Sequence, residues 1–183
     1  MENELYIKNG VNKPFFQSRK DQKESIKILF ICHGNICRSP MAEFIFKDIV
    51  QKEGVASHFV IASAATSTEE IWGDVGNPVY PPARKVLAKH GLSCDGKYAV
   101  QLTAEDYDRY DYLIGMDDAN IRNMERMTGH SAVEGKIYKL LTFAGETRDV
   151  SDPWYTRDFE QAYRDIYTGC VAFYEDLRAS GRI

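Results

Sequence analysis

The chain has 183 residues, a length that suits one ordinary α/β domain and leaves little room for a second. Hydrophobic residues make up 44% and charged residues 27%, so we expect a packed core rather than a disordered chain. The net charge of −4 argues against a protein whose main partner is the backbone of a nucleic acid. It leaves room for an anionic substrate, because a local nest of backbone amides binds phosphate even in an acidic protein.

The positions of the cysteines and histidines argue against a disulfide-rich domain and against a zinc-binding protein. The four cysteines are scattered and form no C-x-x-C pair, unlike the framework of a small disulfide-rich domain. The four histidines are dispersed and show no spacing typical of zinc ligands. No apolar run approaches the length of a membrane span, and the first residues lack a signal-like apolar region. We therefore expect a soluble, cytoplasmic protein with no metal, no cofactor and no membrane partner.

Two regions follow from the local composition. Residues 1–25 are polar and mixed, with turn signals and a charged stretch, and they sustain no helical or strand period. We expect them to form a flexible N-terminal extension, with docking of a partner as the alternative. Residues 26–183 then form the single domain.

The domain begins with a strand, a short loop and a helix. The segment 26–31 (IKILFI) is apolar and rich in β-branched residues, as a buried parallel strand should be. The loop 32–38 (CHGNICR) follows directly. Ser39 is a good N-cap and Pro40 suits the first helical position, so we expect a helix from there to about Gly54.

The rest of the domain alternates strands and helices. Further strands are expected at 59–62, 110–115 and 137–141, and further helices at 83–90, 118–127 and 159–177. Gly and Pro mark 63–82 as a long functional loop, and 149–155 is another loop. The order predicts a doubly wound, four-stranded parallel sheet with helices on both faces, which binds its ligand at the carboxyl ends of the strands.

The loop after the first strand carries the chemistry. A helix N-terminus, a ring of backbone N–H groups and the Arg38 guanidinium all favour the thiolate form of Cys32, and the same donors bind a phosphate dianion. Gly34 allows a sharp turn, and Asn35 tolerates a left-handed backbone. Arg38 can contact two phosphate oxygens at once, and Ser39 can donate a hydrogen bond to the Cys32 sulfur.

The string Cys-x-Gly-Asn-x-Cys-Arg-Ser-Pro at 32–40 resembles the loop of the low-molecular-weight protein tyrosine phosphatase family. Three more segments match that family, namely SAATS at 63–67, GMDxxN at 115–120 and SDPWY at 151–155. Together they extend the resemblance over roughly residues 26–177. The fifth residue of the loop, Ile36, is branched and apolar as in the tyrosine phosphatases, whereas a threonine there resembles the arginine phosphatases.

The resemblance implies a hydrolase that acts on phosphotyrosine through a cysteinyl-phosphate intermediate. Cys32 would be the nucleophile, Arg38 the phosphate clamp and Asp152 the general acid. Asn35, Ser39, Ser63 and His90 would form a polar network that holds the loop, and Cys37 would pair with Cys32 on oxidation. The residues expected to bind substrate are His33, Gly34, Asn35, Ile36, Cys37, Ser39, Trp72, Trp154 and Tyr155.

Two departures from the family pattern concern the substrate. The family often places an aromatic shortly after the SAATS run, where Glu69 stands here, so Trp72 is a candidate for the aromatic wall instead. Trp154 stands where a tyrosine is common. These two departures leave the choice of substrate open but do not affect the residues expected to carry out the reaction.

Several alternatives stay open at this point. The same loop serves arginine-phosphate hydrolysis or arsenate reduction, and a catalytically silent phosphate-binding module is the rival of another class. Asp117 either orients Arg38 or caps the following helix. We expect a monomer or weak dimer whose partner is a phosphotyrosine protein or a small aryl phosphate.

Overall fold

The computed structural model describes residues 24–183; residues 1–23, which hold nearly all of the expected extension, lie outside the described residues. Four parallel strands form the central sheet in the order β2-β1-β5-β6. Their bounds are Ile26–Cys32 (β1), Phe59–Ala65 (β2), Tyr112–Gly115 (β5) and Ile137–Lys139 (β6). The strand order changes direction at β1, and such a point binds ligands beyond the carboxyl ends of the strands.

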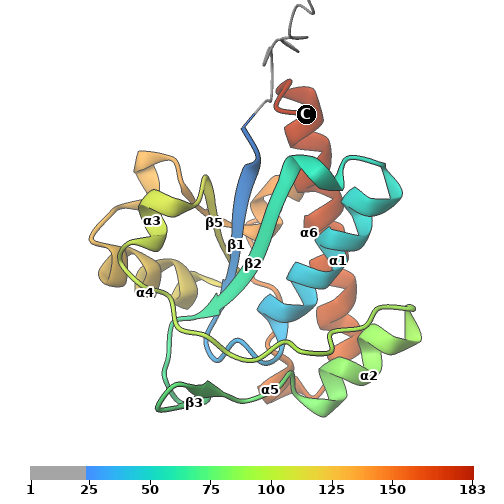
Figure 1. The fold of residues 1–183 in the computed structure, drawn as a ribbon, viewed down its shortest axis with the longest axis vertical. Coiled ribbons are helices and arrows are strands. Elements are labelled where there is room, and N and C mark those ends of the chain that lie inside the picture. The colour runs from blue at the N-terminus through green and yellow to red at the C-terminus, as the bar shows by residue number, and fades with distance from the viewer. Residues whose placement is uncertain (1–23) are drawn as a thin grey trace, which may run out of the picture.

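Helices cover both faces of the sheet, which confirms the predicted fold class (Figure 1). On one face lie α1 (Arg38–Lys52), α2 (Pro81–Lys89) and α6 (Phe159–Ala179). On the other lie α3 (Asp106–Arg109) and α4 (Asp118–Thr128). Alternate residues of β1 serve the two cores, since Phe30 packs with the α1 side and Ile31 with the α4 side.

The segment 63–82 contains more regular structure than the loop predicted for it. β2 continues to Ala65, because its last residues pair in parallel with the end of β1. A two-stranded antiparallel hairpin follows, made of β3 (Ile71–Trp72) and β4 (Val75–Gly76). Gly76 is required there, since a Cβ at this position would lie 1.9 Å from the Ala99 carbonyl oxygen.

Other predicted boundaries also shift. Helix α1 begins at Arg38, and Ser39 is not its N-cap, because the Ser39 hydroxyl bonds to side chains instead. The expected loop 149–155 contains the single-turn helix α5 (Pro153–Thr156), for which Asp152 is the N-cap. The expected strand 137–141 ends at Lys139, where a 3₁₀ turn begins. The 3₁₀ turns are η1 (Ala56–His58), η2 (Ala132–Glu134) and η3 (Leu140–Ala144).

In Figure 1 the carboxyl ends of β1 and β2 point toward the end of the molecule that carries the β3 hairpin, α5 and the start of α2. Segments distant in sequence therefore meet at one edge of the sheet. Among residues 24–183, no helix is both long and apolar enough to cross a membrane.

Candidate active site

The loop 32–38 joins the last residue of β1 to the first residue of α1. Its carbonyl groups are tied to neighbouring segments, because Thr66 N–H donates to Cys32 O (3.0 Å) and Tyr80 N–H donates to Ile36 O (2.8 Å). Asn35 has a φ of 57°, in the left-handed region that the sequence led us to expect it to tolerate. The loop is thus held between β2 and α2 with its turn at Asn35.

The segment 69–70 lies directly against the loop at Gly34. A Cβ at this position would lie 3.0 Å from the Glu70 side chain, a tight contact that a small shift of that side chain would relieve.

The Cys32 thiol lies at the base of the site. Its side chain is buried at 3% exposure, and its sulfur is 3.0 Å from the Ser39 hydroxyl oxygen. Burial, followed by the nearby Cys32 and Asp152, raises the pKa of the neighbouring Cys37 thiol far above its ordinary value. Burial likewise raises the pKa of Cys94 and of Cys170. These three thiols are therefore protonated at neutral pH and are poor nucleophiles.

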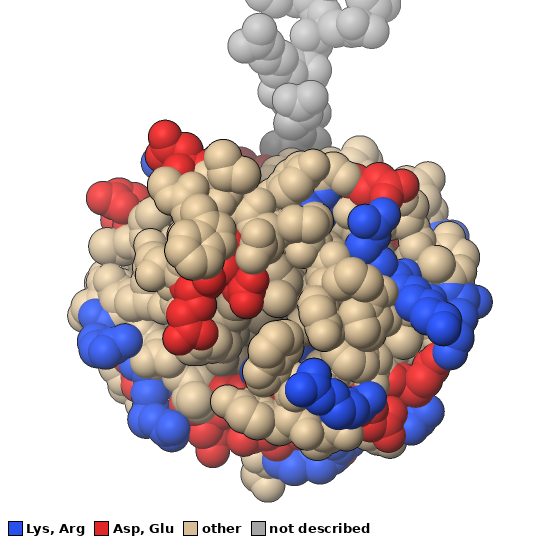
Figure 2. Space-filling model, turned by 90° about the horizontal axis from the view of Figure 1, so that it is seen from below, with Lys and Arg blue, Asp and Glu red and all other residues tan. Residues whose placement is uncertain are grey.

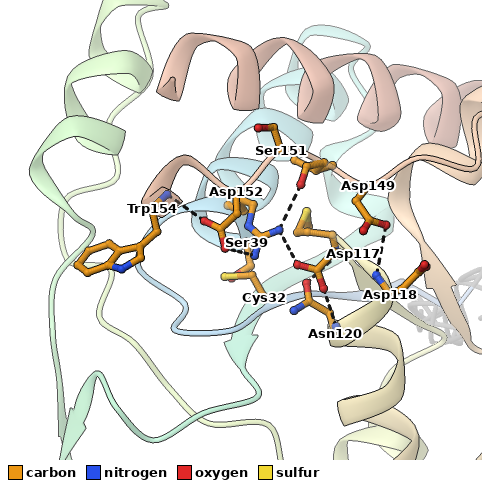
Figure 3. A network of polar contacts seen from close by, with 12 residues as sticks. Cys32, Ser39, Asp117, Asp118, Asn120, Asp149, Ser151, Asp152 and Trp154 are labelled. Atoms are coloured by element: carbon orange, nitrogen blue, oxygen red, sulfur yellow. Dashed lines mark hydrogen bonds and ion pairs between the residues drawn. The ribbon is translucent and has the colours of Figure 1, made fainter. Parts of the chain in front are cut away.

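Arg38 lies between two carboxylates. Its Nη1 donates to Asp117 Oδ2 (2.7 Å) and to the Val150 carbonyl (3.2 Å), and its Nη2 donates to Asp152 Oδ2 (2.7 Å). Each carboxylate thus pairs with a different nitrogen of the guanidinium, and Figure 3 shows Asp117 and Asp152 close to Cys32. Burial opposes the charge, but Cys32, Asp152 and Asp117 outweigh it and raise the pKa of Arg38. The guanidinium is thus a permanently charged, rigidly oriented donor.

Asp117 performs both of the roles left open by the sequence. Its Oδ2 accepts from Arg38, and its Oδ1 accepts from the backbone N–H of Asn120 (2.7 Å) as the N-cap of α4. Asp152 is also an N-cap, because its Oδ1 accepts from Trp154 N–H (2.9 Å). Each carboxylate is therefore anchored to a helix start through one oxygen and to Arg38 through the other.

A cavity opens above the Cys32 thiol. Figure 2 shows this end of the molecule, where acidic side chains lie beside a hollow near the middle of the face. The cavity is lined by residues from the loop, from 69–70, from the start of α4 and from α5, namely Cys32, His33, Gly34, Ile36, Cys37, Arg38, Glu69, Glu70, Asp117, Ala119, Asn120, Asn123, Asp152, Trp154 and Tyr155.

Most residues predicted to bind substrate line this cavity. Trp154 and Tyr155 form part of its wall, at 45% and 82% exposure. Asn35 and Ser39 are fully buried and do not line the cavity. Trp72 is 73% exposed on β3 and does not line the cavity described here. His33 lies at the rim, where its Nε2 is 3.0 Å from Glu69 Oε2.

The sequence did not lead us to Glu70, Asn120 and Asn123 as lining residues, nor to Glu43 and Lys97 behind the loop. The motif GMDxxN offered a signal for Asn120, whereas Glu43 and Lys97 belong to no recognisable pattern. His90 does not join Asn35, Ser39 and Ser63; its ring stacks on Tyr163 with centroids 3.8 Å apart. Among residues 24–183, no group of three or more His, Cys, Asp or Glu side chains is placed to hold a metal ion.

Comparison with known proteins agrees with this geometry. Residues 27–182 match the model of the family described as low molecular weight phosphotyrosine protein phosphatase. The low molecular weight protein-tyrosine-phosphatase YfkJ of Bacillus subtilis is 40% identical over 157 residues, which cover 85% of this chain and 95% of the relative. The low molecular weight phosphotyrosine protein phosphatase of Rattus norvegicus is 37% identical over 155 residues, covering 82% and 95%.

Solved structures show the same similarity in three dimensions. The crystal structure of YfkJ superposes with a TM-score of 0.78 at 36% identity, covering 87% of this chain and 99% of the other. The crystal structure of a Drosophila arginine phosphatase superposes with a TM-score of 0.72 at 28% identity, covering 82% and 97%. The match over residues 27–182 and the Cys32–Arg38 loop at the switch point of the sheet lead to one conclusion: the chain belongs to the low molecular weight phosphotyrosine protein phosphatase family, whose members are hydrolases.

Proposed function

We propose that this protein hydrolyses phosphotyrosine through a cysteinyl-phosphate intermediate, with Cys32 as nucleophile, Arg38 as phosphate clamp and Asp152 as general acid. One observation carries the proposal. The Nη2 of Arg38 is 2.7 Å from Asp152 Oδ2, and both residues line the same cavity as Cys32. A nucleophile, a cation and a proton donor thus converge on the place where a phosphate would sit.

In the first step the Cys32 sulfur attacks phosphorus, an S–P bond forms and the bond from phosphorus to the tyrosyl oxygen breaks. Asp152 gives its proton to the departing oxygen, so that tyrosine leaves as a neutral phenol. Arg38 binds the equatorial oxygens, where negative charge is concentrated in the transition state.

Asp152 occupies an Arg38 nitrogen that an equatorial phosphate oxygen would also use. Binding of the substrate dianion exchanges this ion pair for an arginine–phosphate contact. The Asp152 carboxyl then loses its cationic partner and faces a phosphate, and both changes favour its protonated form. Substrate binding in this way prepares Asp152 to act as an acid.

In the second step a water molecule attacks the cysteinyl phosphate, and the S–P bond breaks. Asp152 now accepts a proton from that water, and Cys32 leaves as a thiolate, stabilised by a hydrogen bond from Ser39. Inorganic phosphate departs and the starting state is restored.

The natural substrate is a phosphotyrosine protein or a small aryl phosphate. Trp154 and Tyr155 supply the aromatic wall for the ring; Trp154 is itself packed against Tyr80, with ring centroids 5.5 Å apart. The exposed Trp72 of β3 would contact residues of the substrate outside the cavity. We place the protein in the cytoplasm as a monomer or weak dimer.

Hydrolysis of an aryl phosphate by the wild type and by Cys32→Ser tests the proposal. The assay contains a metal chelator and covers about pH 5 to 8, the range in which a carboxyl acid and a thiolate act together. We expect wild-type turnover in chelator and none in Cys32→Ser, which should still bind phosphate. Turnover by the variant would disprove the assignment of the nucleophile.

Arginine-phosphate hydrolysis is the second candidate. Glu69 and Glu70 line the cavity, and their carboxylates would attract a guanidinium leaving group. Ile36, which also lines it, favours the aryl substrate. A direct comparison of kcat/KM for phosphotyrosine and phosphoarginine decides between the two, and a higher value for phosphoarginine would reverse our preference.

A further inference from the structure

A chain of buried hydrogen bonds leads away from Cys32 on the side opposite the cavity. The Cys32 sulfur is 3.0 Å from Ser39 Oγ, and Asn35 Nδ2 donates to Ser39 Oγ (2.8 Å) and to Ser63 Oγ (2.9 Å). Ser63 Oγ in turn bonds to Glu43 Oε2 at 2.5 Å. All five residues are at most 5% exposed, so water does not compete for these groups.

The donors and acceptors at the ends of this chain determine its direction. The backbone N–H of Val100 can only donate, and it lies 3.1 Å from Asn35 Oδ1, so the amide nitrogen of Asn35 must face the two serines. An ionised Glu43 can only accept, so Ser63 gives its hydrogen to Glu43 and receives one from Asn35.

Ser39 receives the other hydrogen of the same amide nitrogen. The Ser39 hydroxyl hydrogen therefore remains free to point to the Cys32 sulfur, since its alternative acceptor, the Ala64 carbonyl, is farther away at 3.4 Å. A hydroxyl that donates to sulfur stabilises the thiolate, whereas one that accepts from the thiol does not.

Lys97 completes the far end of the chain. Its Nζ donates to the Ser63 carbonyl (2.9 Å) and lies 3.3 Å from Glu43 Oε2, the oxygen that Ser63 uses. Its side chain is only 13% exposed, and that of Glu43 is 6% exposed. The other oxygen of Glu43 accepts from Lys47, which is 42% exposed. Lys97 is the more buried of the two cations that pair with Glu43, so water screens its charge less.

We infer that Glu43 and Lys97 are positioning residues for the proposed reaction: Lys97 pairs with the Glu43 carboxylate, and Glu43 orients Ser63 and Asn35 so that Ser39 donates its hydrogen to the Cys32 sulfur. The inference rests on the proposed role of Cys32 as nucleophile. Neither residue lines the cavity. Glu43 reaches the sulfur through Ser63, Asn35 and Ser39, whereas Lys97 also interacts electrostatically with Cys32 itself.

Alkylation of Cys32 by iodoacetamide as a function of pH tests this without any substrate turnover. We compare Lys97→Met with Lys47→Met, a matched control that removes the exposed cation from the same carboxylate. In Lys97→Met the pH of half-maximal labelling should rise by about one unit, and kcat/KM at neutral pH should fall about tenfold, the effect of one weakened hydrogen bond to a charged group. Lys47→Met should change kcat/KM by no more than about twofold, and it should shift the labelling midpoint by no more than about 0.3 pH units.

The other titratable groups near the sulfur are Arg38, Asp152 and Cys37, and those near Glu43 include Tyr110; all are the same in every variant compared. Lys97→Arg retains the charge and should restore most of the wild-type labelling profile. If Lys97→Met does not fold, Glu43→Gln provides the same comparison, because it removes the charge that accepts from Ser63.

Combination with Ser39→Ala separates positioning from general weakening of the structure. If Lys97 acts through Ser39, adding Lys97→Met to Ser39→Ala should produce no further shift in the labelling midpoint. Additive shifts in the double variant, or a wild-type labelling profile in Lys97→Met, would overturn the inference. If the wild type does not hydrolyse aryl phosphates but the labelling midpoint still shifts in Lys97→Met, the result would count against the proposed substrate alone.

Discussion

Arg38 is the residue at which the two halves of the site meet. Its guanidinium joins the start of α4, through Asp117, to the loop before α5, through Asp152. Because it is only 3% exposed and its orientation is set by both carboxylates, a lysine could not replace it without losing one of these contacts. The two aspartate side chains differ in exposure, at 17% for Asp117 and 26% for Asp152.

Replacement of Asp152 by alanine should reduce kcat for an aryl phosphate by about 10²- to 10⁴-fold, because the leaving oxygen then departs without a proton. The loss should be smaller for a substrate with an acidic phenol, which needs less protonation. Steady-state rates on two phenols of different acidity measure both effects.

Asp149→Ala is the control for Asp152→Ala, since Asp149 belongs to the same loop but pairs with Lys139 away from Cys32. We expect a much smaller loss of kcat than in Asp152→Ala, because Asp149→Ala removes one contact of the segment but keeps the acid. An equal loss in the two variants would assign the effect to the loop rather than to the acid.

Among the individual residues of the site, those of the loop were predicted well from the sequence, because they are consecutive and their pattern is specific. The polar network behind the loop was predicted only in part. Asn35, Ser39 and Ser63 come together, but the place expected for His90 is taken by Lys97 and Glu43. Glu43 and Lys97 are 54 positions apart and lie in no shared motif, so only the folded chain reveals them as a pair.

Among the elements, the segment that carries Asp152 is held from α6 and from β6. Asp165 of α6 accepts from Arg148 Nη2 (2.9 Å) and Gln161 Nε2 (2.9 Å), and it is 2% exposed. Lys139, the last residue of β6, pairs with Asp149 at 2.9 Å. Figure 3 shows Asp149, Ser151 and Asp152 of this segment, and Arg38 donates to the Val150 carbonyl and to Asp152 within it. The position of the proposed acid thus depends on contacts made outside the cavity.

Asp165 should make the stability of the protein depend on pH. Burial raises its pKa, but hydrogen bonds from Arg148 and Gln161 outweigh this and lower it. A lowered folded-state pKa stabilises the native state above the unfolded value of about 3.9, and the benefit is lost as the pH falls through the folded value. Asp165→Asn should therefore be less stable by about 1–3 kcal/mol at neutral pH.

Urea unfolding at neutral pH and at acidic pH measures this dependence. The difference between the wild type and Asp165→Asn should shrink as the pH falls, because the carboxylate is then protonated in both states of the wild type. Asp158→Asn, which changes the exposed N-cap of the same helix, is the control. A constant difference across the pH range would contradict the account of Asp165.

The helices and strands predicted best are those whose hydrophobic pattern extends over many residues. The helix at 159–177 was recognised from its apolar face and is observed as α6 at Phe159–Ala179. The β3–β4 hairpin was missed because each strand has only two residues and forms no period. Helix α3, with four residues, was missed for the same reason.

For the whole molecule, the described core and cavity are built from residues 26–183. Every buried residue of the two cores and every residue that lines the cavity lies in this range. The family match covers residues 27–182. The proposed domain therefore contains all the parts that the mechanism uses.

Removal of residues 1–23 should consequently leave kcat/KM for a small aryl phosphate within about twofold of the full chain, as for a change remote from the site. The melting temperature should change little as well. A large loss of activity with an unchanged melting temperature would show that the N-terminal residues take part in the site.

Cys32 should carry a phosphoryl group during turnover. Rapid acid quenching of the wild type with an aryl phosphate, followed by peptide mass spectrometry, detects this intermediate. Fragmentation of the peptide that contains both Cys32 and Cys37 should place one phosphoryl group on Cys32, and Cys37→Ser should leave that result unchanged. Turnover with the phosphoryl group on another residue, or with none on the enzyme at any quench time, would contradict the account.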